Sequence, residues 1–316
     1  MSNFPKTVFI REEGPREGFQ ILKEVFPTED KARLIEALAQ TGITSIETTS
    51  FVRPDRIPQH ADAEELAKLL LTKNIPSTVR LRALYLNEKG FLRALQCPAF
   101  KTEGYVHIAG SSKFLEKNSN ITLEQALTKI PTWIELFQAN NIRFERLMVS
   151  TAFGDQYAGT VSLKQIKEII GKAHKIAKES GEVFEEITLA DTTGWAQPEQ
   201  VRSFVAELKS DYPDIHICLH LHDTRGLGMP NVYAGLLEGV DRFDASLAGL
   251  GGCPFSGNAA GNVPTEDVAF LCENLGIKTG LNLNKYIECA KLAESIIKQK
   301  LPGKLKDAGL NTVHNS

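Results

Sequence analysis

The chain has 316 residues, of which 42% are hydrophobic and 24% are charged, as in a globular protein with a large core. Its formal net charge of −3 argues against a nucleic-acid-binding protein or a basic protein of the membrane surface. The five cysteines form no CxxC pair, which favours reduced thiols, and no secretory leader or membrane-spanning stretch is recognisable. We therefore expect a soluble cytoplasmic protein whose partners are neither nucleic acid nor membrane.

Short β-type runs alternate with amphipathic helical patterns along the whole chain, and no Pro/Gly/Ser-rich linker divides it. Strands are predicted to begin near Val8, Ile43, Thr78, Tyr105, Ile142, Glu186, His216 and Phe243. Helices are predicted over residues 28–41, 62–71, 87–96, 122–140, 162–180, 197–210, 229–238 and 265–275. Several of these helices open with capping residues such as Thr122 and Ser162.

Alternating strands and helices of this number and spacing predict an α/β fold, a (β/α)8 TIM barrel with a C-terminal helical extension. A doubly wound open sheet is the alternative, but such a chain is usually shorter or split in two. We predict a single domain over residues 1–316. Within it, residues 281–316 form the extension, and the amphipathic stretch 283–300 packs outside the barrel or against a partner subunit.

The residues that follow five of the predicted strands are unusually rich in ionisable groups and glycine. Barrel enzymes place their chemistry at the carboxyl ends of the strands and in the loops just after them. The shared position of these segments therefore predicts one active site. The segments are residues 11–18, 47–51, 191–194, 220–223 and 249–253.

His220 and His222 lie two residues apart at the end of the seventh predicted strand, so their side chains point to the same face. Two neutral imidazoles side by side make half of a site for a divalent metal. The spacing alone is equally consistent with two hydrogen-bonded core histidines. The position of the other unusual segments favours the metal site.

Mg²⁺ and Mn²⁺ prefer octahedral oxygen and nitrogen ligands. Glu17, after the first strand, is the obvious carboxylate ligand, and the amide oxygen of Asn262 is a further one. The alternatives are a surface carboxylate paired with Lys or Arg for Glu17, and a helix N-cap or turn residue for Asn262.

Arg16, beside Glu17, suits the stabilisation of an oxyanion because its guanidinium stays charged and donates in a planar fork. A structural salt bridge to Glu47 or Glu12 is the alternative, and both roles are compatible. Glu47 and Asp191 are expected to orient Arg16 or one of the histidines.

Cys253 lies in a loop with five glycines among fifteen residues, 248–262, which suits a flap that closes over a ligand. A thiol on such a flap could exchange a proton with a reacting group once water is excluded. A buried thiol without chemical function is the alternative. The other four cysteines fall on helical or strand patterns and are expected in the core.

Taken together, four stretches resemble the 3-hydroxy-3-methylglutaryl-CoA lyase family, metal-dependent barrel lyases related to isopropylmalate synthase. The resemblance runs from residue 6 to about residue 300, and the Gly-Leu-Gly-Gly-Cys-Pro loop is its most specific part. The stretches are residues 14–20, 46–52, 220–224 and 240–267.

The resemblance implies retro-Claisen cleavage of a 3-hydroxy-3-methylglutaryl-CoA-like thioester to acetyl-CoA and a keto acid such as acetoacetate. It implies that Mg²⁺ or Mn²⁺ is bound by Glu17, His220, His222 and Asn262. Relatives are often dimers, so a homodimer or higher homo-oligomer is expected. We expect Arg16, Glu47, His220 and Cys253 to be catalytic, and Arg16, Gln20, Ser50, Asp191 and Thr192 to contact the substrate.

The chain departs from the family where Glu17 replaces the usual Asp and where Phe255 replaces a frequent tyrosine. These differences bear on the acyl group more than on the reaction class. The alternatives to this function are a Claisen-condensing acyltransferase of the isopropylmalate or citramalate synthase type, a lyase for another branched hydroxyacyl-CoA, and a non-catalytic metal-binding relative.

Overall fold

The computed structural model describes residues 4–252 and 261–310. The chain divides into two compact units, which are described separately. Among the described residues, the arginine unit comprises residues 9–101, 245–251 and 261–310, and the histidine unit comprises residues 4–8, 102–244 and 252. The single-domain organisation predicted over residues 1–316 stays a prediction.

Three parallel strands, in the order β3-β2-β1, form the sheet of the arginine unit. They are β1 (Phe9–Glu12), β2 (Ser45–Ser50) and β3 (Arg80–Leu84). The register of β2 on β3 shifts between Glu47 and Thr49. The helical segments of this unit are α1 (Gly14–Gln20), α2 (Thr28–Ala39), η1 (Pro58–His60), α3 (Ala63–Leu70), α4 (Glu88–Leu95), η2 (Leu247–Gly249), α11 (Thr265–Asn274), α12 (Leu283–Ile297) and α13 (Leu305–Ala308).

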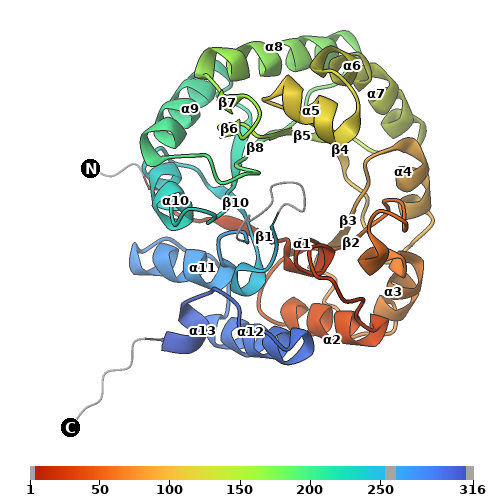
Figure 1. Ribbon diagram of the computed structural model, residues 1–316, viewed down its shortest axis with the longest axis vertical. Coiled ribbons are helices and arrows are strands. Elements are labelled where there is room, and N and C mark those ends of the chain that lie inside the picture. The colour runs from red at the N-terminus through yellow and green to blue at the C-terminus, as the bar shows by residue number, and fades with distance from the viewer. Residues whose placement is uncertain (1–3, 253–260, 311–316) are drawn as a thin grey trace. The chain divides into compact units, whose positions relative to one another are not determined.

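The core of the arginine unit forms where the apolar faces of its helices meet the strands. Helix α12 packs beside α2, which in turn contacts α3 (Figure 1). Leu34 and Leu38 of α2 and Tyr286 of α12 belong to one cluster and are fully buried. The C-terminal amphipathic stretch predicted over 283–300 is thus a helix with a buried face, as its periodicity indicated.

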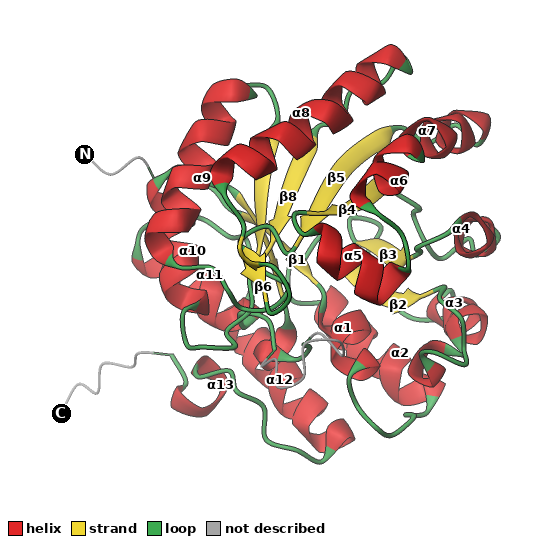
Figure 2. Ribbon diagram, turned by 45° about the horizontal axis from the view of Figure 1, so that its top comes forward, coloured by secondary structure: helices red, strands yellow, loops and turns green. Residues whose placement is uncertain are grey.

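Five parallel strands, in the order β4-β5-β8-β9-β10, form the sheet of the histidine unit. The helices α7, α8 and α9 lie outside β4, β5 and β8 (Figures 1 and 2). The strands are β4 (Gly104–Ala109), β5 (Phe144–Ser150), β8 (Glu186–Ala190), β9 (His216–His220) and β10 (Arg242–Ala245), with a short hairpin of β6 (Gly154–Asp155) and β7 (Gly159–Thr160) after β5. The helices are α5 (Ser112–Ser119), α6 (Leu123–Thr128), α7 (Ile130–Ala139), α8 (Leu163–Glu179), α9 (Pro198–Asp211) and α10 (Gly228–Leu237).

Two sequence predictions about helices were wrong. The single helix predicted over 122–140 is two helices, α6 and α7, because Pro131 at the start of α7 lacks the N–H that a continuous helix needs. Residues 14–20, predicted as part of a loop after the first strand, form α1. Pro15 in the first turn fixes a helical φ, and the acidic Glu17 suits the positive end of the helix dipole.

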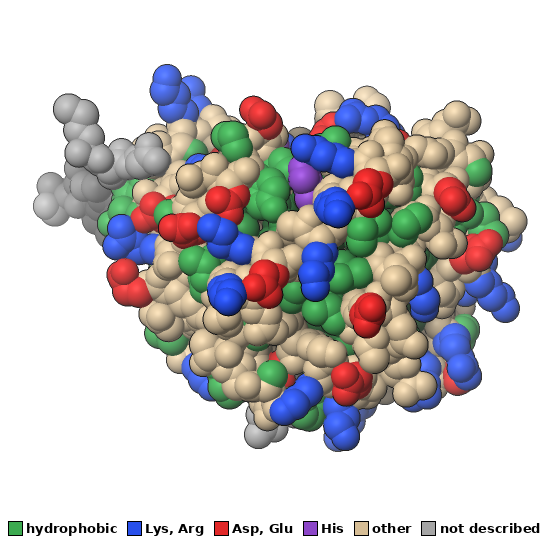
Figure 3. Space-filling model, turned by 90° about the horizontal axis from the view of Figure 1, so that it is seen from above, with side chains coloured by type: hydrophobic (Ala, Val, Ile, Leu, Met, Phe, Trp, Pro, Cys, Tyr) green, Lys and Arg blue, Asp and Glu red, His purple; other side chains and the backbone are tan. Residues whose placement is uncertain are grey.

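The surface is that of a protein with nearly balanced charge. Positive and negative side chains are interspersed over the face in Figure 3, in keeping with the net charge of −3. Among the described residues, none of the helices has the length and apolar character needed to cross a membrane.

Two carboxyl groups are buried in the arginine unit near the turn η2. Glu12 accepts hydrogen bonds from the Leu247 backbone N–H at 2.7 Å and the Thr265 hydroxyl at 2.7 Å. Glu266 accepts one from the Ala248 N–H at 3.0 Å. Burial raises the pKa of Glu12 to about 7 and that of Glu266 to about 8. Both side chains therefore anchor the turn η2, which leads into the glycine-rich loop. Their carboxyl groups stay protonated up to near-neutral pH.

We expect the free energy of unfolding to fall less with rising pH in the Glu266→Gln variant than in wild type. The folded pKa lies above the unfolded value of about 4.5, so folded protein retains a proton that unfolded protein releases between pH 4.5 and 8. The free energy of unfolding therefore falls across that window, by a few kcal/mol at about 1.4 kcal/mol per pKa unit. Urea denaturation at pH 5.5 and 8 measures the difference. Glu288→Gln, at an exposed position of α12, is the control, and equal pH dependence in wild type and Glu266→Gln would contradict the argument.

Candidate active site

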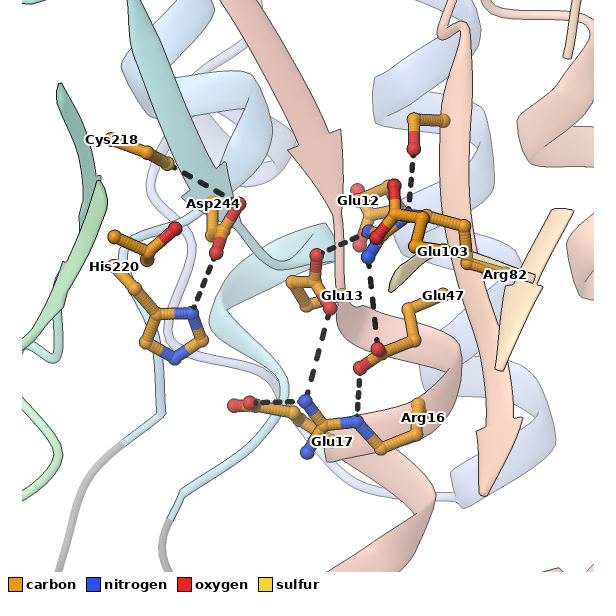
Figure 4. Close-up of polar contacts among 12 residues, drawn as sticks. Glu12, Glu13, Arg16, Glu17, Glu47, Arg82, Glu103, Cys218, His220 and Asp244 are labelled. Atoms are coloured by element: carbon orange, nitrogen blue, oxygen red, sulfur yellow. Dashed lines mark hydrogen bonds and ion pairs between the residues drawn. The ribbon is translucent and has the colours of Figure 1, made fainter. Parts of the chain in front are cut away.

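Arg16 of α1 is a buried cation surrounded by three carboxylates (Figure 4). Its Nε donates to Glu47 of β2, and its Nη2 donates to Glu17 at 2.8 Å and lies 3.8 Å from Glu13. Burial alone would lower the pKa of Arg16, but Glu17, Glu47 and Glu13 raise it above its ordinary value. The guanidinium is therefore permanently charged and fixed in orientation. The predicted pairing with Glu47 is confirmed, whereas Glu12 bonds elsewhere.

A second buried arginine completes this cluster. Arg82 of β3 donates from Nη2 to Glu13 at 2.5 Å and from Nε to the Ser45 hydroxyl at 2.8 Å, and its Nη1 lies 3.7 Å from Glu47. Two guanidinium groups thus lie among three carboxylates.

Asn262 contacts the carboxylate of Glu17 from the other side. Its Nδ2 donates to Glu17 Oε2 at 2.6 Å, and its Oδ1 is buried without a hydrogen-bond partner among the described residues. The alternative role of Asn262 as a helix N-cap was wrong, because Pro264 holds that position of α11. Gly251 has φ 120°, and a Cβ added to it would lie 3.1 Å from the Cβ of Glu17, so the loop approaches Glu17 as closely as glycine permits.

The histidine unit brings the two predicted imidazoles together. The Nε2 atoms of His220 and His222 lie 3.3 Å apart, and both side chains are buried. His220 Nδ1 lies 3.2 Å from Oδ2 of Asp244, on the neighbouring strand β10 (Figure 4). Since a carboxylate accepts hydrogen bonds, Nδ1 carries the proton and Nε2 carries the lone pair. This is the tautomer that a metal ligand requires.

Asp244 was missed by the sequence reasoning. It also accepts a hydrogen bond from the Cys218 thiol at 3.6 Å, and Arg146 lies 3.8 Å away. The signal that could have identified it is an acidic residue between the apolar Phe243 and Ala245 of β10, directly in register with His220. Asp223, which directly follows His222, accepts a hydrogen bond from the Gly228 N–H at 2.7 Å.

Asp191 and Thr192 build the turn that follows β8. Asp191 Oδ1 accepts from the N–H groups of Trp195 at 2.6 Å and Ala196 at 3.0 Å, and burial raises the pKa of this carboxyl to about 7. Its Oδ2 is buried without a partner among the described residues. The Thr192 hydroxyl accepts from the Thr151 N–H at 2.9 Å. The substrate contacts predicted for both residues stay predictions.

The remaining predicted site residues are Ser50, Gln20 and Cys253. In the arginine unit, Ser50 is buried at the end of β2, with a hydroxyl that lacks a partner among the described residues, and Gln20 is half-buried at the end of α1. Cys253 lies outside the described residues. The other cysteines are buried, as predicted, and they are Cys97, Cys218, Cys272 and Cys289.

Each cluster lies where a parallel strand ends: Arg16 and Glu17 directly after β1, and the histidine pair at the end of β9. Barrel enzymes keep their reacting groups at these ends. The chain is an α/β-barrel enzyme, and comparison with known proteins identifies the group. A family model described as HMGL-like matches residues 7–293. The chain belongs to this family.

Two human relatives are both hydroxymethylglutaryl-CoA lyases. The human mitochondrial hydroxymethylglutaryl-CoA lyase is 34% identical over 308 residues, which cover 98% of this chain and 91% of that protein. The human cytoplasmic 3-hydroxy-3-methylglutaryl-CoA lyase is 33% identical over 311 residues, covering 98% of this chain and 81% of that protein.

Solved structures give the same result. The HMG-CoA lyase of Bacillus subtilis matches with a TM-score of 0.87 and 34% identity, covering 96% of this chain and 98% of that one. An HMG-CoA lyase of Acinetobacter baumannii, in complex with coenzyme A and 3-methylmalate, matches with a TM-score of 0.87 and 33% identity over 100% of both chains. The predicted barrel fold and family are confirmed, and the chain is a carbon–carbon lyase.

Proposed function

We propose that this chain cleaves 3-hydroxy-3-methylglutaryl-CoA, or a close 3-hydroxyacyl-CoA, to acetyl-CoA and a keto acid such as acetoacetate. One observation carries the proposal: a chain of the HMGL-like family places an acid-flanked arginine after β1 and converging imidazoles at the end of β9. The relatives named above are hydroxymethylglutaryl-CoA lyases, and one of them binds coenzyme A.

We propose further that the two clusters bind one divalent cation, Mg²⁺ or Mn²⁺. Glu17, His220 and His222 supply a carboxylate and two imidazoles, a donor set that suits such an ion. The unpartnered Oδ1 of Asn262 fits a cation as well. When bound, the ion would lower the pKa of the substrate's tertiary hydroxyl and hold its oxygens in place.

Arg16 would stabilise the negative charge that the cleavage leaves on acetyl-CoA. Breaking the bond between the thioester's α-carbon and the tertiary carbon leaves the electron pair on acetyl-CoA, as an enolate whose negative charge rests on oxygen. A guanidinium fixed by Glu47 and Glu17 is preorganised for that oxygen. Cys253 is the proposed donor of the proton that the enolate carbon then gains. His220, or a carboxylate such as Glu47, is proposed to accept the proton of the tertiary hydroxyl.

The remaining features of the proposal concern binding and assembly. Gln20, Ser50, Asp191 and Thr192 are proposed to contact the substrate. Ser50 closes β2, Asp191 and Thr192 follow β8, and Gln20 ends the helix that carries Arg16. Asp191 Oδ2 and the Ser50 hydroxyl are buried polar atoms suited to such contacts. We propose a homodimer or higher homo-oligomer by analogy with the family, and a cytoplasmic location like that of the human cytoplasmic relative.

Removal of the metal and of the Cys253 thiol provides the test. Purified protein with Mn²⁺ is expected to release acetyl-CoA from 3-hydroxy-3-methylglutaryl-CoA. Release should stop with EDTA and fall by about two orders of magnitude in Cys253→Ser, the scale for loss of a general acid. Cys272→Ser, at a buried thiol of α11, is the control. Undiminished turnover in EDTA would exclude the metal-dependent mechanism, and turnover only of another hydroxyacyl-CoA in a substrate panel would correct the acyl group.

A further inference from the structure

A third histidine of the chain, His60, lies next to the backbone of Arg16 in the arginine unit. His60 belongs to η1 and is only 3% exposed. Its Nε2 lies 2.9 Å from the carbonyl oxygen of Arg16, and its Nδ1 lies 3.3 Å from the hydroxyl of Thr49 on β2. The imidazole therefore bridges the helix that carries Arg16 and the strand that carries Glu47.

The partners of the ring determine its protonation. A carbonyl oxygen only accepts, so Nε2 carries the proton and donates to Arg16, while Nδ1 accepts from the Thr49 hydroxyl. Burial lowers the pKa of His60 to about 4, and the nearby charges of Lys31 and Arg16 also act to lower it. At neutral pH the ring is an uncharged bridge with one defined tautomer.

The segment that carries His60 is itself fixed in place. Lys31 of α2 is 1% exposed, and its Nζ donates to the Asp62 carboxylate at 2.8 and 2.9 Å and to the Gln59 carbonyl at 2.5 Å. The side-chain amide of Gln59 donates to the carbonyl of Leu22, just after α1. A buried ion pair with this many hydrogen bonds gives η1 a single position relative to α1 and α2.

Strand β2 consequently holds both the side chain and the backbone carbonyl of Arg16. Glu47 of β2 accepts from its Nε, and Thr49 of β2 holds its carbonyl through His60. The register shift of β2 falls between these two positions. A guanidinium aimed at a reacting oxygen must be held to within a fraction of an ångström. The carboxylates orient the guanidinium, and the bond from His60 adds a restraint on the backbone of the seven-residue helix that carries it.

We propose that His60 is a positioning residue, which sets the place of the Arg16 guanidinium through the Arg16 carbonyl. Its effect on turnover rests on the proposed role of Arg16 in stabilising the enolate. Its effect on Arg16 itself does not depend on the substrate.

The test compares His60→Met, which keeps the volume but removes the donor, with His60→Gln, whose amide can still donate. We expect His60→Met to lower kcat about tenfold with KM within twofold, as for loss of orientation rather than of binding. His60→Gln should recover at least half of that loss. His174→Met, at a histidine of α8 packed against Phe184 and Tyr212, should leave kcat unchanged.

A second measurement is independent of turnover. The ¹⁵N-edited NMR signal of Arg16 Nε–H, assigned with Arg16→Lys, should broaden or move in His60→Met and return in His60→Gln. An unchanged Arg16 signal in His60→Met would overturn the proposal, as would full kcat in an active enzyme. If wild type proves inactive while the signal moves, the proposed function fails and the positioning role stands. Thr49→Val, which removes the donor to Nδ1, replaces His60→Met if that variant does not fold, and the same signal must respond.

Discussion

Arg16→Met should lower kcat by about a thousandfold while the protein still binds Mn²⁺. Removal of one preorganised donor to a developing oxyanion costs about 10²–10³ in rate, and Met removes the charge as well. The kcat of Arg16→Lys should lie between that of Arg16→Met and that of wild type. An ammonium group is a point charge that cannot reproduce the fork by which Nε reaches Glu47 and Nη2 reaches Glu17.

The measurement is steady-state acetyl-CoA release, together with the exchange of acetyl-CoA methyl protons with deuterated solvent. Exchange requires the same enolate but no carbon–carbon cleavage, so both rates should fall in Arg16→Met. Arg93→Lys, on α4 and paired with Glu64, is the matched control. If Arg16→Met kept kcat within fivefold of wild type, the arginine would be a structural ion-pair partner only.

Local patterns in the sequence were sufficient for most elements of the fold. The predicted strand that begins near His216 is β9, and the predicted helix over 162–180 is α8 (Leu163–Glu179) with Ser162 as its N-cap. The capping box at Thr122 and Gln125 is present as well. Hydrophobic period, cap residues and strand spacing are local properties, and for that reason one sequence reveals them.

Pairings between distant segments were much harder to predict. The pairing of Arg16 with Glu47 could be predicted because α1 directly follows β1, and β1 lies beside β2 in the sheet. Arg82 and Asp244 lie inside strands, so their buried side chains resemble ordinary polar residues in the sequence. Only the register of β10 on β9 places Asp244 opposite His220.

Glu17 shows what the structure adds to a departure seen in the sequence. Its side chain is one methylene longer than the aspartate that is usual in the family. In the arginine unit both of its oxygens are engaged, Oε1 by Arg16 and Oε2 by Asn262. The longer side chain is thus part of a hydrogen-bond network with Arg16 and Asn262.

His222→Ala is expected to abolish Mn²⁺ binding at micromolar concentration and to lower kcat by about three orders of magnitude. A missing imidazole leaves the ion without one of two converging nitrogen ligands, and excess metal cannot replace it. Asp244→Asn is expected to act differently. Asp244 fixes the tautomer of His220, so its loss should weaken Mn²⁺ affinity about 10- to 100-fold, and excess Mn²⁺ should restore turnover.

Titration with Mn²⁺, followed by electron paramagnetic resonance, separates the two variants, because free and bound ions give different signals. His216→Ala is the control on the same strand, since His216 is exposed at its start and lies 3.5 Å from Asp241. Its affinity and turnover should equal those of wild type, because His216 precedes the buried part of β9. Tight Mn²⁺ binding in His222→Ala would show that the imidazole pair is a structural feature of the strand and would place the metal elsewhere.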